Sequence, residues 1–210
     1  MKHKNFGDQN IMNKRNIALF DFDGTITTDD SLLKFIRFVV GDRNFLLGLV
    51  VLSPMLVLYK FKLIPNYKAK QYMLSWFFKG MSKDAFLKVA NEYSLVHIDK
   101  ILRPKAIEKI NWHKNQGHKV VVVSASIECW LRPWCEKNGL ELIATKLEIK
   151  DDIVTGKLLS KNCYGVEKVN RIKEIYNLKD FEYIYSYGDS SGDKQMLELA
   201  HEKFYKPFRD

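Results

Sequence analysis

The sequence has few cysteines and no uninterrupted apolar run long enough to cross a membrane. Three cysteines occur in 210 residues, and none forms a CxxC pair, which argues against a disulfide framework and suits reduced thiols. The longest apolar run, residues 45–59 (FLLGLVVLSPMLVLY), is interrupted by Ser53 and Pro54, and a membrane-spanning helix needs about 20 residues. We therefore expect no transmembrane segment.

Acidic residues are outnumbered by basic ones. The chain has 34 Lys and Arg against 25 Asp and Glu, a formal net charge of +9, which favours anionic partners such as phosphorylated metabolites, nucleic acid or an anionic membrane. The cations are spread without a dense block, and no nucleic-acid-binding signature accompanies them, so no nucleic-acid partner is expected. Residues 1–16 are polar and lack the apolar core of a secretory signal. We expect a cytoplasmic protein with a frayed N-terminus.

The remaining composition is that of a globular protein, and its apolar pattern predicts an α/β fold. Short apolar runs at 17–20, 119–123 and 182–185 read as buried strands, and 141–144 adds another. Helical stretches at 104–116, 128–138 and 166–176 alternate with them. This alternation predicts a Rossmann-like parallel sheet with helices on both faces. A small hairpin is expected from 147–149 and 153–154, across Asp151 and Asp152.

The segment from Ser31 to Val96 departs from this alternation. It contains no strand followed by a turn, but four helical stretches, 31–40, 44–61, 67–78 and 82–93, the last beginning at a Ser N-cap. We therefore predict two parts: a catalytic core of residues 1–29 and 97–210, and an inserted all-helical cap of residues 30–96.

Four loops at the carboxyl ends of the predicted strands carry the polar residues that suit a site. They are DFDGT at 21–25, SAS at 124–126, the region around Lys168, and GDSSGD at 188–193. In an open α/β sheet, ligands bind beyond these strand ends. Four aspartates together would repel one another unless a cation neutralises some of them, and oxygen ligands without His or Cys select Mg²⁺. The cluster predicts Mg²⁺ together with a substrate phosphate.

These four motifs, in this order, resemble those of the haloacid dehalogenase superfamily of phosphatases. The match covers the whole predicted core, with DFDGT, VVVSAS, Lys168 within GVEKVNRI, and GDSSGD. The resemblance implies that Asp21 is the nucleophile that forms an aspartyl phosphate, and that Asp23 is the general acid and base. An acid at position 23 argues for phosphate chemistry over dehalogenation, because cleavage of a carbon–halogen bond needs no proton donor.

The resemblance also implies roles for the residues around Asp21. Ser124 would hydrogen-bond the transferring phosphoryl group and Lys168 would balance its charge. Mg²⁺ would be held by Asp21, by the carbonyl oxygen of Asp23 and by Asp189. The supporting phosphate-binding residues would be Gly24, Thr25, Ala125 and Asp193.

An insert directly after the first motif resembles the cap of the subfamily that includes phosphoserine phosphatases. That family carries a glutamate nine residues after the nucleophile and a cap arginine, whereas this chain has Asp30 and no arginine between Asn44 and Leu102. These departures weigh against phosphoserine, although Lys68, Lys70 or Lys79 could substitute for the arginine. Phosphoserine phosphatase stays the alternative to a phosphatase for another small metabolite or for a lipid phosphate.

The apolar run at 45–59 leaves two interpretations open. A helix that is apolar on all sides packs either inside protein or against lipid, and flanking cations at Arg43, Lys60 and Lys62 suit anionic headgroups. The apolar cap segment is similar to that of the phosphatidylglycerophosphate phosphatase branch of the same subfamily. This resemblance supports the second interpretation and implies a lipid phosphate substrate and peripheral membrane contact through the cap. A different class, a non-catalytic receiver of a phosphorelay, fits poorly because receivers are shorter and lack an insert.

Overall fold

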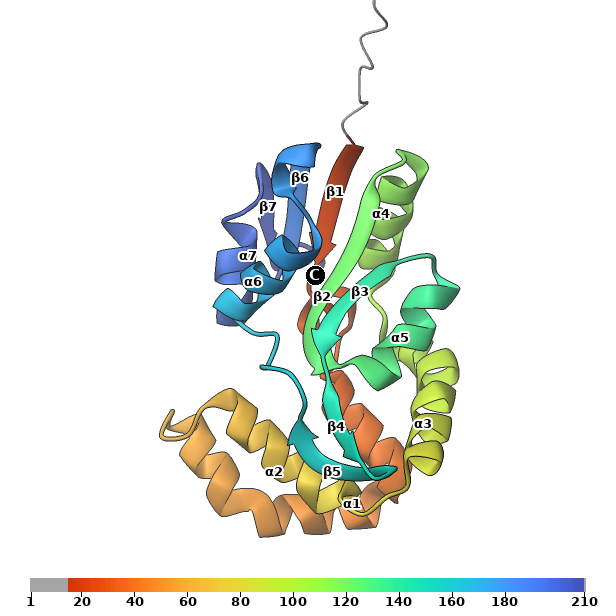
Figure 1. The fold of residues 1–210 in the computed structure, drawn as a ribbon, viewed down its shortest axis with the longest axis vertical. Coiled ribbons are helices and arrows are strands. Elements are labelled where there is room, and N and C mark those ends of the chain that lie inside the picture. Colours follow the sequence, from red (N-terminus) through yellow and green to blue (C-terminus); the bar gives the residue numbers. More distant parts are fainter. Residues whose placement is uncertain (1–14, 210) are drawn as a thin grey trace, which may run out of the picture.

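A five-stranded parallel sheet forms the centre of the protein. The computed structural model describes residues 15–209, and its strands run in the order β3-β2-β1-β6-β7 (Figure 1). The strands are β1 (Arg15–Phe20), β2 (Lys119–Ile127), β3 (Glu141–Thr145), β6 (Phe181–Gly188) and β7 (Glu202–Tyr205). All four strand pairs are parallel. The frayed N-terminus expected from the sequence lies outside the described residues.

Helices cover both faces of this sheet because alternate side chains of the strands point to opposite sides. In β1, Ala18 and Phe20 pack in one apolar cluster with α4 (Pro104–Asn115) and α5 (Glu128–Lys137). The neighbouring residues Ile17 and Leu19 pack in a second cluster with α6 (Val166–Ile175) and α7 (Lys194–Leu197). The predicted α/β fold with helices on both faces is confirmed.

The helical insert lies beyond the carboxyl ends of the strands, at the lower end of the molecule in Figure 1. It consists of α1 (Ser31–Lys60), α2 (Asn66–Phe78) and α3 (Lys83–Glu92). The two helices predicted at 31–40 and 44–61 are joined into α1, with a kink at Gly41, whose φ is 76°. The predicted N-cap is present, because the Ser82 side chain accepts a hydrogen bond from the Ala85 amide.

The predicted hairpin, β4 (Leu147–Lys150) and β5 (Ile153–Leu158), extends from the core segment onto this helical insert. The amide of Val154 donates to the carbonyl of Met81 at 2.9 Å, and the amide of Gly80 donates to the carbonyl of Val154 at 3.0 Å. Backbone hydrogen bonds therefore tie the helical insert to the core at a point far from its entry in the sequence.

Two features of the fold were not predicted. Strand β7 has a polar sequence, EKFY, and is exposed along most of its length at the edge of the sheet, so it lacks the apolar run by which a buried strand is recognised. An irregular turn, residues 22–26, follows β1 and contains the first motif. Among the described residues, no helix is both long and apolar enough to span a membrane.

Candidate active site

The first motif leaves β1 in a tight turn that folds its side chains over the end of the sheet. The amide of Asp21 donates to the carbonyl of Tyr187 on β6, at 2.9 Å, which anchors the turn to the neighbouring strand. The hydroxyl of Thr25 donates to the Asp21 carboxylate at 3.1 Å. Gly24 has φ +83°, and a Cβ there would lie 2.4 Å from an oxygen of Asp189. Glycine at this position therefore allows both the backbone conformation and the close approach of the fourth motif.

Lys168 joins the first and fourth motifs through two buried ion pairs. Its Nζ lies 2.6 Å from Oδ1 of Asp21 and 2.6 Å from Oδ1 of Asp193, and the lysine is only 1% exposed. Burial alone would lower the pKa of this lysine, but the two carboxylates outweigh it and raise the pKa. Lys168 is therefore a permanent cation beside the Asp21 carboxylate.

The fourth motif supplies two further carboxylates that differ in their surroundings. Asp193 accepts hydrogen bonds from the amide and hydroxyl of Ser190 and from the amide of Asp189. These contacts and Lys168 lower the pKa of Asp193 although burial opposes them. Burial raises the pKa of Asp189 instead, although this residue pairs with Arg209 near the C-terminus.

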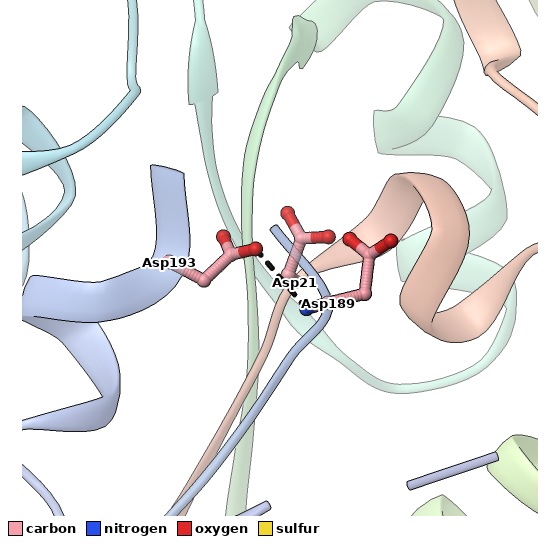
Figure 2. A group of neighbouring side chains, drawn as sticks. All are labelled: Asp21, Asp189 and Asp193. Atoms are coloured by element: carbon pink, nitrogen blue, oxygen red, sulfur yellow. Dashed lines mark hydrogen bonds between the residues drawn. The ribbon is translucent and has the colours of Figure 1, made fainter. Parts of the chain in front are cut away.

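Figure 2 shows the carboxyl groups of Asp21, Asp189 and Asp193 side by side, with the bond from the Asp189 amide to Asp193 dashed. One oxygen from each lies within 4.8 Å of the others. Burial raises the pKa of Asp21 to about 7, against the opposing effect of Lys168. Clustered carboxylates raise the pKa of one another, and a divalent cation would relieve this repulsion. The three carboxylates offer only hard oxygen donors, so this donor set fits the predicted Mg²⁺.

Asp23 makes its hydrogen bonds to residues outside this cluster, one of them at the start of α1. Its carboxylate accepts hydrogen bonds from the Ser31 amide at 2.6 Å and from the Ser126 hydroxyl at 2.5 Å. Burial raises the pKa of Asp23 to about 6, and the nearby Asp30 carboxylate adds to the shift. A carboxyl group with a pKa near neutrality can both donate and accept a proton, as general acid and base catalysis requires.

The second motif places its two hydroxyls differently. Ser124 is fully buried, and its hydroxyl accepts a hydrogen bond from the Ser126 amide at 3.0 Å. Ala125 and Ser126 line the cavity described below, whereas Ser124 is not among the lining residues. The role predicted for Ser124 stays a prediction, and the structure adds Ser126 as the hydroxyl that contacts Asp23.

Seven of the predicted residues line one cavity of about 480 Å³ between the sheet and the helical insert. Its lining includes Asp21, Asp23, Asp30, Ala125, Lys168, Asp189 and Asp193. Asp30 also caps α1, because its carboxylate accepts from the Leu33 amide at 3.1 Å.

Lys70 is the cap lysine that reaches this cavity. Its Nζ donates to the Ala125 carbonyl at 2.5 Å and to Asn162 Oδ1 at 2.9 Å. Burial lowers its pKa to about 8. The other two cap lysines proposed as substitutes for an arginine, Lys68 and Lys79, are exposed.

Sequence reasoning missed several residues around the site. Ser126 is the second serine of the SAS motif at 124–126, so the motif itself could have identified it as a site residue. Ser31, Asn162, Tyr164 and Arg209 lie far from the motifs in sequence or in segments without a pattern, and reach the site only through the fold.

Comparisons with known proteins agree with this geometry. The model of the haloacid dehalogenase-like hydrolase family matches residues 18–198. The chain is 34% identical to Protein CicA of Caulobacter vibrioides over 195 residues. This matched stretch covers 92% of this chain and 86% of that protein. It is 35% identical over 109 residues to a Mycobacterium tuberculosis protein named "Probable phosphatase Rv3661", covering 50% of this chain and 38% of that protein. The chain belongs to the haloacid dehalogenase-like hydrolase family.

Solved structures show the same fold. A Bordetella pertussis protein described as having unknown function superposes with a TM-score of 0.77 at 24% identity, covering 90% of this chain and 89% of that one. A phosphoserine phosphatase, solved as an analogue of its phospho-aspartyl intermediate, gives a TM-score of 0.59 at 23% identity. The superposition covers 90% of this chain and 85% of that one. The predicted superfamily and fold are confirmed, and the predicted enzyme class, a phosphatase, agrees with these findings.

Proposed function

We propose that this hydrolase is a magnesium-dependent phosphomonoester phosphatase that works through an aspartyl phosphate, an acyl phosphate formed on Asp21. The observation that carries the proposal is the position of the Asp21 carboxylate. It lies in the cavity, 2.6 Å from the Lys168 ammonium and beside the carboxylates of Asp189 and Asp193. A nucleophilic carboxylate next to a fixed cation and further acidic ligands suits attack on an anionic phosphate.

In the first half of the reaction, a carboxylate oxygen of Asp21 attacks phosphorus and the bond from phosphorus to the alcohol oxygen breaks. Asp23 donates its proton to the departing alkoxide. In the second half, Asp23 takes a proton from water, the water oxygen attacks phosphorus, and the bond from phosphorus to Asp21 breaks. Inorganic phosphate leaves, and both carboxyl groups return to their starting states.

The remaining side chains hold this arrangement. Lys168 stabilises the negative charge on the phosphoryl group, and Thr25 and Ser126 orient Asp21 and Asp23 respectively. We assign the Mg²⁺ site to Asp21, Asp189 and the carbonyl oxygen of Asp23. Bound Mg²⁺ would offset the repulsion between the phosphate and the carboxylates.

The substrate is a phosphate monoester from one of two classes: a small phosphorylated metabolite, or a lipid phosphate such as phosphatidylglycerophosphate. We propose that residues 30–96 act as the cap that selects it, since helices α1 and α2 line the cavity. The protein would act in the cytoplasm, and with a lipid substrate at the inner face of the membrane. Phosphoserine is the alternative substrate, and Lys70 supports it as a cation in the cavity wall.

The test is a panel assay of phosphate release with and without Mg²⁺. It compares phosphoserine, sugar phosphates, nucleotides and phosphatidylglycerophosphate, with Asp21→Asn as the inactive control. We expect Mg²⁺-dependent release by the wild type, and mass spectrometry of acid-quenched enzyme should find phosphate on Asp21. Phosphate binding without release on any substrate would instead favour a non-catalytic protein that resembles a phosphorelay receiver.

A further inference from the structure

The cavity has a charged floor and an apolar wall. The floor consists of the carboxylates and Lys168, whereas α1 and α2 contribute Phe45, Leu49, Leu56 and Met73 to the wall. A phosphate group alone would use only the floor. The wall can contribute binding energy only when the substrate carries an apolar body, because apolar surfaces gain free energy by leaving water together.

The outer face of α1 is apolar as well, and it is exposed. Leu46, Leu47 and Val50 are 60%, 59% and 70% exposed, and Phe61 and Leu63, just after the helix, are each 70% exposed. Exposed side chains therefore alternate along α1 with the residues that line the cavity. Monomeric proteins rarely expose large apolar patches, so a group of exposed apolar side chains along one helix points to a contact surface. We call residues 46–63 on this side the outer face of α1.

The charge of the cap indicates what covers this face. Between Asp42 and Asp84 the sequence has seven cationic residues and no acidic one. Lys70 lies in the cavity and Lys83 pairs with Asp152, so the cations left to meet a partner are the exposed Arg43, Lys60, Lys62, Lys68 and Lys79. A second copy of this chain would bring a surface of the same sign into contact, which is unfavourable. An anionic bilayer offers both an apolar interior for the outer face and headgroups of opposite charge for the cations.

We propose that the outer face of α1 inserts into the surface of an anionic bilayer, and that the substrate is a phosphate monoester with a long apolar chain. The chain would lie along the apolar wall while the phosphate reaches Asp21. α1 thus presents one side to the membrane and the other to the substrate. The substrate part of the inference rests on the proposed phosphatase function, whereas the membrane part does not.

Vesicle flotation tests the membrane contact without any catalysis. Full-length protein is mixed with vesicles of phosphatidylcholine alone, or of phosphatidylcholine with about one third phosphatidylglycerol, and centrifuged through a density gradient. We expect flotation with the anionic vesicles and at least tenfold less with the neutral ones, declining as salt is raised. Absence of flotation with the anionic vesicles would overturn the proposed membrane contact, and so would a stable dimer that does not float.

Two matched variants locate the contact. Val50→Asp places a charge on the outer face of α1, whereas Ile175→Asp places one on α6, where Ile175 is 58% exposed. Both residues are exposed, so both variants should keep the unfolding temperature of the wild type. We expect Val50→Asp to reduce flotation at least fivefold and Ile175→Asp to leave it unchanged. Equal flotation by the two variants would refute the assignment of this face.

Substrate class is tested with two esters that share a glycerol phosphate group. Dioleoyl phosphatidic acid in anionic vesicles carries two long chains, and glycerol 3-phosphate carries none. We expect kcat/KM at least tenfold higher for the lipid. Equal or better hydrolysis of glycerol 3-phosphate would overturn the substrate class and leave the phosphatase function standing. Failure to release phosphate from these esters and from p-nitrophenyl phosphate would instead refute the phosphatase function itself.

Discussion

Replacement of Asp23 by Asn tests the assignment of the proton donor most directly. The asparagine has nearly the same shape, so its carbonyl oxygen can still accept the bond from the Ser31 amide, and its amide group can donate to the Ser126 hydroxyl. The variant should therefore fold normally but lack the proton. General acid catalysis contributes about 10²- to 10⁴-fold in rate, so we expect kcat to fall by that factor, or about 3–5 kcal/mol of activation free energy.

Substrates with different leaving groups distinguish the loss of a proton donor at position 23 from general damage to the active site. Departure of p-nitrophenolate needs little help from an acid, whereas departure of an alkoxide does. With p-nitrophenyl phosphate, Asp23→Asn should therefore form the Asp21 phosphate quickly and hydrolyse it slowly, which stopped-flow absorbance would record as a burst of nitrophenol. With an alkyl phosphate the first step should also be slow, so no burst of alcohol is expected.

Asp30→Asn is the matched control, since Asp30 is a nearby carboxylate that also lines the cavity. Asparagine is a good helix N-cap, so α1 should be preserved. If Asp30 selects substrate, this variant should change KM more than kcat and should show no burst. The assignment of Asp23 as acid and base would be refuted if Asp23→Asn slowed both esters equally and without a burst.

Three further results are expected. Lys168→Met leaves two buried carboxylates unpaired and should lower the free energy of unfolding by about 3–5 kcal/mol, measured by urea denaturation without Mg²⁺; a loss below 1 kcal/mol would contradict the buried ion pairs. Gly24→Ala places a methyl group against Asp189, and calorimetry should show Mg²⁺ affinity reduced by about 10- to 100-fold, whereas unchanged affinity would remove Asp189 from the metal site. Burial lowers the pKa of His113 to about 3, so below about pH 6.5 this group binds its proton only in the unfolded chain, and its own contribution to stability should fall as pH drops, by at most about 1.4 kcal/mol per pH unit. Urea denaturation between pH 7.5 and 5 should show that the stability of His113→Gln relative to the wild type increases as the pH is lowered, and a constant difference would refute this role.

The residue types and the order of the motifs could be predicted from the sequence because they depend on local patterns. A buried strand needs consecutive apolar residues, and a parallel sheet brings the carboxyl ends of its strands to one edge. The positions of Asp21, Asp189 and Asp193 beside one another therefore followed from two loops and their strands. The same local reasoning failed at β7, because a short polar edge strand has no such pattern.

The sequence alone determined that this protein has an α/β core with aspartates at the strand ends and a helical insert after the first strand. Only the tertiary structure decided that Lys70 enters the cavity while Lys68 and Lys79 stay exposed, and that Ser126 contacts Asp23. It also divided the apolar residues of α1 between the cavity wall and an exposed face. The physical reason is that the sequence shows which faces of a helix are apolar. What each face packs against depends on segments that are distant in the chain.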